Sequence, residues 1–98
     1  MVEIRWTIQA VDDLESIVNF ISSDSVHYAK LLASDIFEAI ELSALFPESG
    51  RVVPELNMRE IREILFGNYR IIYRFQNDII EIITIYHGSR LLDPKSIK

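Results

Sequence analysis

Apolar residues recur at steps of three and four in the first half of the chain, which predicts two amphipathic helices because residues at that spacing share one helix face. The first series is Ala10, Val11, Leu14, Ile17, Val18 and Ile21, and the second is Ala29, Leu32, Ala33, Ile36, Phe37, Ile40 and Ala44. Thr7 is expected to cap the first helix, and Pro47 to close the second. The polar stretch 22–25 predicts the break between them and offers caps for the second helix.

After Pro47 the apolar period becomes two, which is typical of strands. A loop at 48–57 with a short extended piece at 51–53 precedes a strand at 59–66, and two further strands follow the turns at 67–68 and 77–78. Residues 2–6 predict a short first strand. The expected class is α+β: an N-terminal strand, a helical hairpin, and an antiparallel meander of three to four strands. With 98 residues, of which 49% are hydrophobic, residues 1–98 are expected to form a single domain.

The strand that begins at Tyr69 carries arginines on one face and aromatic residues on the other, because successive strand residues point to opposite faces. The expected core face holds Tyr69, Ile71, Tyr73 and Phe75, and the expected working surface holds Arg70, Ile72 and Arg74. A two-residue turn at 77–78 predicts the pairs Phe75–Ile80, Arg74–Glu81, Tyr73–Ile82, Ile72–Ile83, Arg70–Ile85 and Tyr69–Tyr86. In that register Glu81 holds Arg74, whereas Arg70 faces no acid and its guanidinium is expected to be available to an anion.

Composition narrows the possible functions. The chain has no cysteine, which excludes disulfides, thiolate catalysis and cysteine-ligated zinc. It has no apolar signal core and no apolar run near the ~20 residues that a bilayer requires, so a soluble, cytoplasmic protein without cofactor or metal is expected. The net charge of −5 is unevenly distributed, at −7 for residues 1–48 and +2 for residues 49–98. This asymmetry indicates either two functional surfaces, an acidic one that is solvated and a basic one that binds, or helices that simply carry solvated acids.

Several short motifs, in this order and spacing, resemble the ParE/RelE superfamily of toxins from type II toxin-antitoxin modules, a family that includes plasmid stabilisation proteins. The motifs are Ala10-x-x-Asp13-Leu14-x-x-Ile17, Leu45-Phe46-Pro47, Gly50-Arg51-x-Val53-Pro54-Glu55, Arg59-Glu60-Ile61, Tyr69-Arg70-Ile71-Ile72-Tyr73 and His87-Gly88-Ser89-Arg90-Leu91. The resemblance spans nearly the whole chain. It implies a small toxin that inhibits bacterial growth and is neutralised by a cognate antitoxin, a flexible segment of which folds across its surface.

One branch of this superfamily, the RelE-like one, resembles ribosome-dependent endoribonucleases. For that chemistry the resemblance implies Arg70 and Arg90 as cations that stabilise the phosphorane, and His87 as the acid or base, since imidazole titrates near neutrality. The chain departs from this branch because its only lysines are outside the sheet, at 30, 95 and 98, and because the tyrosine expected a few residues after Arg90 is missing. An acidic chain would also bind poorly to ribosomal phosphates.

The other branch, the ParE-like one, resembles poisons of DNA gyrase. Such a protein needs no catalytic residue, so the departures above do not count against it and we favour this branch. A further alternative is that the chain has decayed into a nontoxic antitoxin-binding module. Antitoxin or target binding is expected at Arg51, Arg59, Arg62 and Arg74. Arg70 and Arg74 could instead be ordinary cross-strand salt-bridge partners, and Arg51 and Arg59 could simply be solvated. His87 could be no more than a hydrogen-bonded residue at a strand end.

Overall fold

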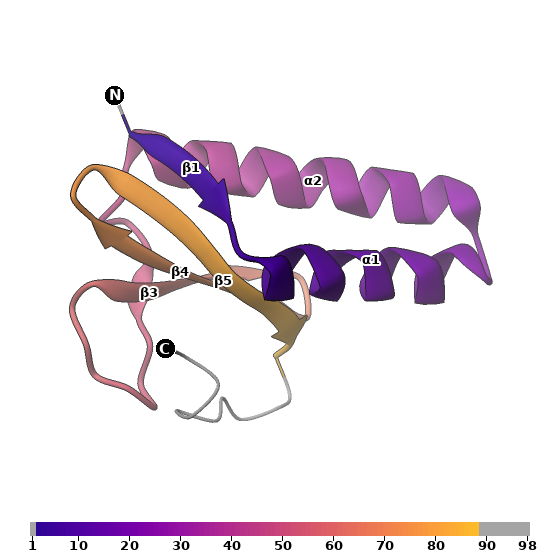
Figure 1. The fold of residues 1–98 in the computed structure, drawn as a ribbon. Helices are drawn as coiled ribbons and strands as arrows, with labels where there is room; N and C mark the ends of the chain where they lie inside the picture. Colours follow the sequence, from indigo (N-terminus) through magenta and orange to yellow (C-terminus); the bar gives the residue numbers. More distant parts are fainter. Residues whose placement is uncertain (1, 89–98) are drawn as a thin grey trace.

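The computed structural model describes residues 2–88 and contains two helices and five strands in that range (Figure 1). In chain order they are β1 (Glu3–Trp6), α1 (Ile8–Ser22), α2 (Val26–Leu45), β2 (Arg51–Val52), β3 (Ile61–Phe66), β4 (Tyr69–Gln76) and β5 (Ile79–His87). The strands form one sheet in the order β1-β5-β4-β3-β2, in which β1 and β5 are parallel and the other neighbours antiparallel. The α+β class and the order of elements are confirmed.

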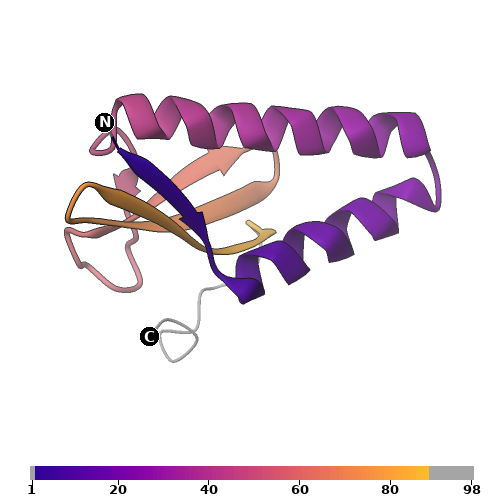
Figure 2. The ribbon, with the colours of Figure 1, turned by 45° about the horizontal axis from the view of Figure 1, so that its top comes forward.

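The two helices lie side by side on one face of the sheet, and the turn between them extends beyond the strands (Figures 1 and 2). Both expected caps are present, because the Thr7 side chain accepts a hydrogen bond from the Ala10 amide and the Ser25 side chain accepts one from the Tyr28 amide. Within residues 2–88 neither helix combines the length and the apolar character that a membrane span needs.

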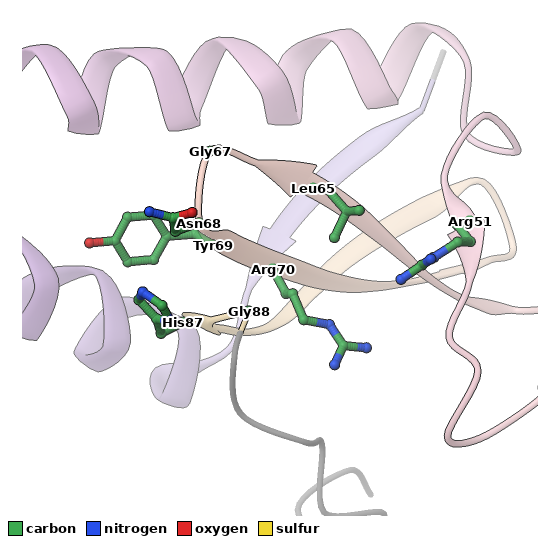
Figure 3. A pocket seen from close by; sticks show the side chains of 8 residues that line it. All are labelled: Arg51, Leu65, Gly67, Asn68, Tyr69, Arg70, His87 and Gly88. Carbon is green, nitrogen blue, oxygen red and sulfur yellow. The ribbon is translucent and has the colours of Figure 1, made fainter.

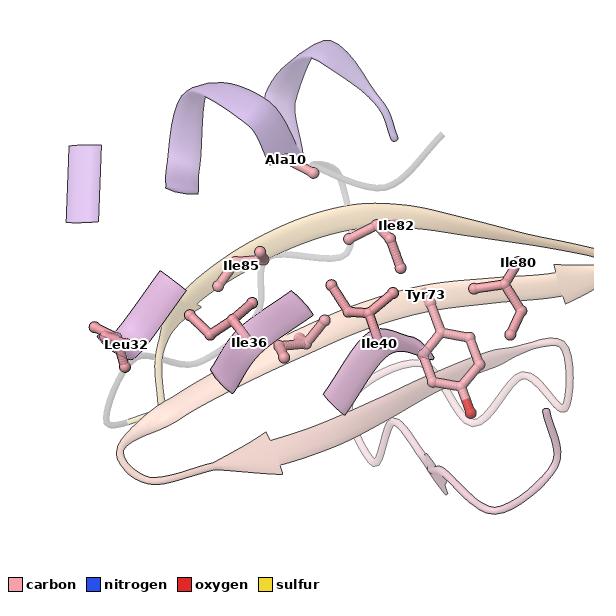
Figure 4. Packing of buried hydrophobic residues seen from close by; sticks show 9 residues of the cluster. Ala10, Leu32, Ile36, Ile40, Tyr73, Ile80, Ile82 and Ile85 are labelled. Atoms are coloured by element: carbon pink, nitrogen blue, oxygen red, sulfur yellow. The ribbon is translucent and has the colours of Figure 1, made fainter. Parts of the chain in front are cut away.

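The main core lies between the helices and the sheet (Figure 4). Its buried members come from both helices and from β4 and β5: Ala10, Leu32, Ile36, Ile40, Ile71, Tyr73, Ile80, Ile82 and Ile85. Trp6 packs against this core from β1, with its ring centroid 5.4 Å from that of Phe37. Burying each of the larger side chains contributes roughly 1.5–3 kcal/mol, so this layer is the principal source of stability.

The predicted register of β4 and β5 is correct near the turn and wrong beyond it. Phe75–Ile80, Arg74–Glu81 and Tyr73–Ile82 pair as expected, and Asn77 and Asp78 both have positive φ, as a two-residue hairpin turn requires. A bulge then shifts the pairing by one residue, giving Ile72–Thr84, Ile71–Ile85, Arg70–Tyr86 and Tyr69–His87.

The bulge follows from packing and from an acid on α1. Strict alternation would place Thr84 on the core face after Ile82. The extra residue instead brings Ile85 onto that face, under the helices, and leaves Ile83 and Tyr86 to pack on the opposite face of the sheet. Asp13 then accepts hydrogen bonds from the Thr84 hydroxyl and, at 3.1 Å, from the Ile85 amide. A carboxylate from α1 therefore secures β5 just past the irregularity.

The face of the sheet without helices is not the open surface that the sequence predicted. The segment after β2 folds over it and builds a second, smaller core of four buried side chains, Val53, Ile61, Ile72 and Ile83. Leu56 and Tyr86 pack against this cluster. Ile72, expected on a working surface, is fully buried, because the loop between β2 and β3 covers the centre of that face.

Candidate functional site

Arg70 is buried in a cluster of charged side chains, so the expectation of an available guanidinium is wrong. Only 7% of its side chain is exposed. Glu55 accepts from Nη1 at 2.7 Å and from Nη2 at 3.0 Å, while Glu63 accepts from Nε at 3.2 Å and from Nη2 at 2.9 Å. Two carboxylates thus bind one arginine in a geometry of charge-assisted, forked hydrogen bonds.

Each member of this cluster comes from a different element. Glu63 lies on β3 with no exposed side-chain area, and Arg51 on β2 is its direct partner in the register. The Arg51 guanidinium donates to Glu63 at 2.8 Å, although 58% of its side chain is exposed. Glu55 comes from the loop between β2 and β3 and is 18% exposed. We call Arg51, Glu55, Glu63 and Arg70 the arginine-glutamate cluster; its formal charge is zero.

The electrostatics keep Arg70 charged. Its pKa is raised above the ordinary arginine value, first by the hydrogen bonds with Glu55 and then by Glu63, against the opposing effect of burial. Its guanidinium carbon also lies 5.4 Å from the centroid of the Tyr86 ring, within the range of a cation–π contact. Arg70 is therefore a permanent cation whose charge is already balanced by neighbours within the chain.

His87 and Arg70 leave the sheet on opposite faces. His87 pairs with Tyr69, which packs under the helices, and the two rings meet edge to face at 5.8 Å. Arg70 pairs with Tyr86, which packs on the other face. His87 and Arg70 nevertheless border the same hollow of about 320 Å³ at the β3–β4 turn, together with Arg51 (Figure 3). The Arg70 guanidinium points away from His87 in that view.

The other arginines of the predicted binding set are spread over the sheet. Arg62 donates to the backbone carbonyls of Glu48 and Gly50, at 3.0 Å and 2.9 Å, and so fixes the approach to β2. Arg74 pairs with Glu81 at 3.2 Å, as predicted from the register. Arg59 is exposed in the turn before β3. Arg90 lies outside the described residues 2–88.

Tyr73 anchors the chain before β2 to the core. Its hydroxyl donates to the Pro47 carbonyl at 2.8 Å and accepts from the Gly50 amide at 3.2 Å. Its pKa is raised from the ordinary tyrosine value by burial. A β-carbon at Gly50 would collide with the Tyr73 ring and hydroxyl, so the close approach requires glycine there.

Glu55 and Glu63 are the members of the site that sequence reasoning missed. One signal was present for Glu63, because the turn at 67–68 pairs Leu65 with Arg70 and so places Glu63 diagonally opposite that arginine. Glu63 is also two residues from Ile61 and so lies on the same face of the strand. A carboxylate buried beside an apolar residue needs a cation as its partner, which again indicates the pair of Glu63 and Arg70. No comparable signal existed for Glu55, whose position depends on the path of a loop.

Comparison with known proteins agrees with this fold. Residues 4–92 match the family model of the ParE toxin of the type II toxin-antitoxin system parDE. The chain belongs to that family and is a toxin of the ParE/RelE superfamily, which implies a cognate antitoxin as its partner.

Individual relatives carry names from both branches. The chain is 33% identical over 87 residues to "Putative toxin Y4kP" of Sinorhizobium fredii, covering 87% of this chain and 86% of that protein. It is 30% identical over 91 residues to toxin RelE2 of Caulobacter vibrioides, covering 93% of this chain and 100% of the relative. A solved structure of the chromosomal ParDE system from P. aeruginosa has the same fold, with a TM-score of 0.73, 20% identity and coverage of 89% of this chain and 96% of that one.

Proposed function

We propose that this chain is a ParE-like toxin that inhibits DNA gyrase through its surface, without a catalytic step on RNA. One observation carries the proposal. The resemblance assigns Arg70 the role of the strand arginine in the RNA-cleaving branch. In this chain two carboxylates bind Arg70, on the face of the sheet opposite His87. Stabilising a phosphorane requires cations aimed at the place where charge develops, and this cation is already aimed at Glu55 and Glu63.

The second candidate is a RelE-like, ribosome-dependent endoribonuclease. It is favoured by the name of the relative RelE2 and by the hollow that Arg51, Arg70 and His87 border. An enzyme of that kind needs its acid or base, whose removal typically lowers the rate by about 10²–10⁴-fold. A gyrase inhibitor has no such requirement.

His87 therefore distinguishes the two candidates in cells. Its side chain is exposed at the end of β5, so His87→Ala should fold as the parent does. Each chain is induced without antitoxin while growth, DNA breaks and messenger RNA ends are followed in the same cultures. We expect His87→Ala to retain growth inhibition and the DNA-break response, with intact messages. Codon-positioned messenger RNA cuts that vanish in the variant would overturn the proposal, and normal growth with the parent chain would indicate a nontoxic binding module.

We also place the antitoxin on the helical layer. Between α1 and the ends of the strands lies a hollow lined by Ile17, Phe20, Tyr69 and Ile85, among others, and Phe20 is 79% exposed as a residue. A segment that folds on binding must bury apolar surface to offset its ordering entropy, and this hollow offers such surface.

Phe20→Ala tests the placement. We expect it to weaken antitoxin binding by about 1–4 kcal/mol, as truncation of an aromatic anchor commonly does. Leu65→Ala is the matched control, because Leu65 is also an exposed apolar side chain but lies on β3 beside Arg70. Equal affinities of the two variants, measured by calorimetry with the purified antitoxin, would contradict the placement.

A further inference from the structure

The contact between Glu55 and Arg70 has the geometry of a bound ligand. The two carboxylate oxygens of Glu55 each accept from a different nitrogen of the guanidinium, Oε2 from Nη1 at 2.7 Å and Oε1 from Nη2 at 3.0 Å. This forked arrangement is the one in which arginine binds carboxylate and phosphate ligands. Glu55 thus occupies the position that an external oxyanion would take.

The two acids of the arginine-glutamate cluster differ in position and in exposure to solvent. Glu63 lies on a strand, has no exposed side-chain area and bonds to both Arg51 and Arg70. Glu55 lies on a loop, on the solvent side of the same arginine. Without the charge of Glu55 the remaining three side chains carry a formal charge of +1. Much of the Arg51 side chain is exposed, next to the hollow at the β3–β4 turn.

We propose that Glu55 is a built-in occupant of an oxyanion site on Arg70, to which the nearby Arg51 adds positive charge, and that it keeps this face of the toxin from binding phosphate groups. The ligand class is a tetrahedral or planar oxyanion, with phosphate as the representative. The inference concerns what the arginine face can bind, and it holds whichever cellular target the toxin has.

Glu55→Gln tests this directly, because it removes the charge and keeps the size and one acceptor oxygen. Binding of inorganic phosphate is measured by phosphorus NMR and by the rise of Tm with phosphate concentration, at constant ionic strength set with chloride. We expect Glu55→Gln to bind phosphate at least about tenfold more tightly than the parent chain. The matched control is Glu48→Gln, which removes the charge of an exposed acid ahead of β2 and should leave phosphate binding at the parental level.

A second variant, Glu55→Ala, leaves room where the carboxylate lay, so phosphate and also formate should stabilise it. Adding Arg51→Gln to Glu55→Gln should abolish the gain. The proposal is overturned if folded Glu55→Gln and Glu55→Ala bind phosphate no better than Glu48→Gln, or if the parent already binds it equally well. If both variants fold only with phosphate present, the proposal is supported. If both variants stay unfolded even with phosphate present, Glu55 is required for folding and the proposal is wrong.

Discussion

Removing the Arg70 guanidinium should destabilise the fold severely. In Arg70→Met, the Glu63 carboxylate would remain on β3 with no exposed area and would keep Arg51 as its remaining cation among the described residues. Deleting one partner of a buried ion pair costs about 3–5 kcal/mol, since it leaves a charge without its counterpart. Because Arg51 still contacts Glu63, the lower limit of about 3 kcal/mol applies. For a chain of this length that corresponds to a fall in Tm of about 12–24 °C.

The reasoning also predicts a rescue. Replacing both buried charges, as in Arg70→Met with Glu63→Met, removes the uncompensated carboxylate on β3, while the Glu55 side chain is already 18% exposed to solvent. Apolar replacement of a buried ion pair is often neutral, so the double variant should return to within about 1 kcal/mol of the parent. Urea and thermal unfolding of the purified toxin, followed by circular dichroism, measure both values.

Arg59→Met is the control, because Arg59 is exposed and its loss should change stability by no more than about 0.5 kcal/mol. The account of the cluster is refuted if Arg70→Met costs less than about 1 kcal/mol, or if the double variant is as unstable as the single one. The expected result also has a practical consequence: loss of toxicity in an Arg70 variant would report unfolding and could not identify a catalytic residue.

Three further predictions concern the supports of the fold. Burial raises the pKa of Tyr73, so above about pH 10 the unfolded chain loses the hydroxyl proton of this residue while the folded chain keeps it. The free energy of unfolding should then fall by up to about 1.4 kcal/mol per pH unit. In Tyr73→Phe, unfolding titrations should show no such fall from this residue. Gly50→Ala should destabilise by about 1–3 kcal/mol in urea unfolding, because the buried Tyr73 ring has no room to yield, and a cost near zero would show that the loop moves freely. Asp13→Ala should speed amide hydrogen exchange at Ile85 and cost about 1–3 kcal/mol, and unchanged exchange would refute its role in securing β5.

Most of the architecture could be predicted from the sequence because it depends on local signals. The helical period, the caps at Thr7 and Ser25 and the turn at 77–78 each act within a few residues, and all are found in the structure. The meander follows from those turns. Short-range chemistry therefore accounts for the elements and their order.

The arginine face could not be predicted, because its state depends on two long-range features. The bulge near Ile83 depends on packing against both faces of the sheet and on Asp13, 71 positions away from Thr84. The balancing of the Arg70 charge depends on a loop that folds across the sheet and brings the Glu55 carboxylate to the guanidinium. Strand periodicity assigns a residue to a face, but it carries no information about what covers that face.

The central claim, that the toxin acts on gyrase and performs no RNA chemistry, is tested most directly with purified components. The toxin is added to DNA gyrase with relaxed plasmid, and in parallel to translating ribosomes with a defined message. We predict loss of supercoiling or accumulation of gyrase-linked DNA breaks, with the message intact, and no effect in either reaction once the cognate antitoxin is bound. Cleavage of the message within the ribosome, with supercoiling unaffected, would contradict the account.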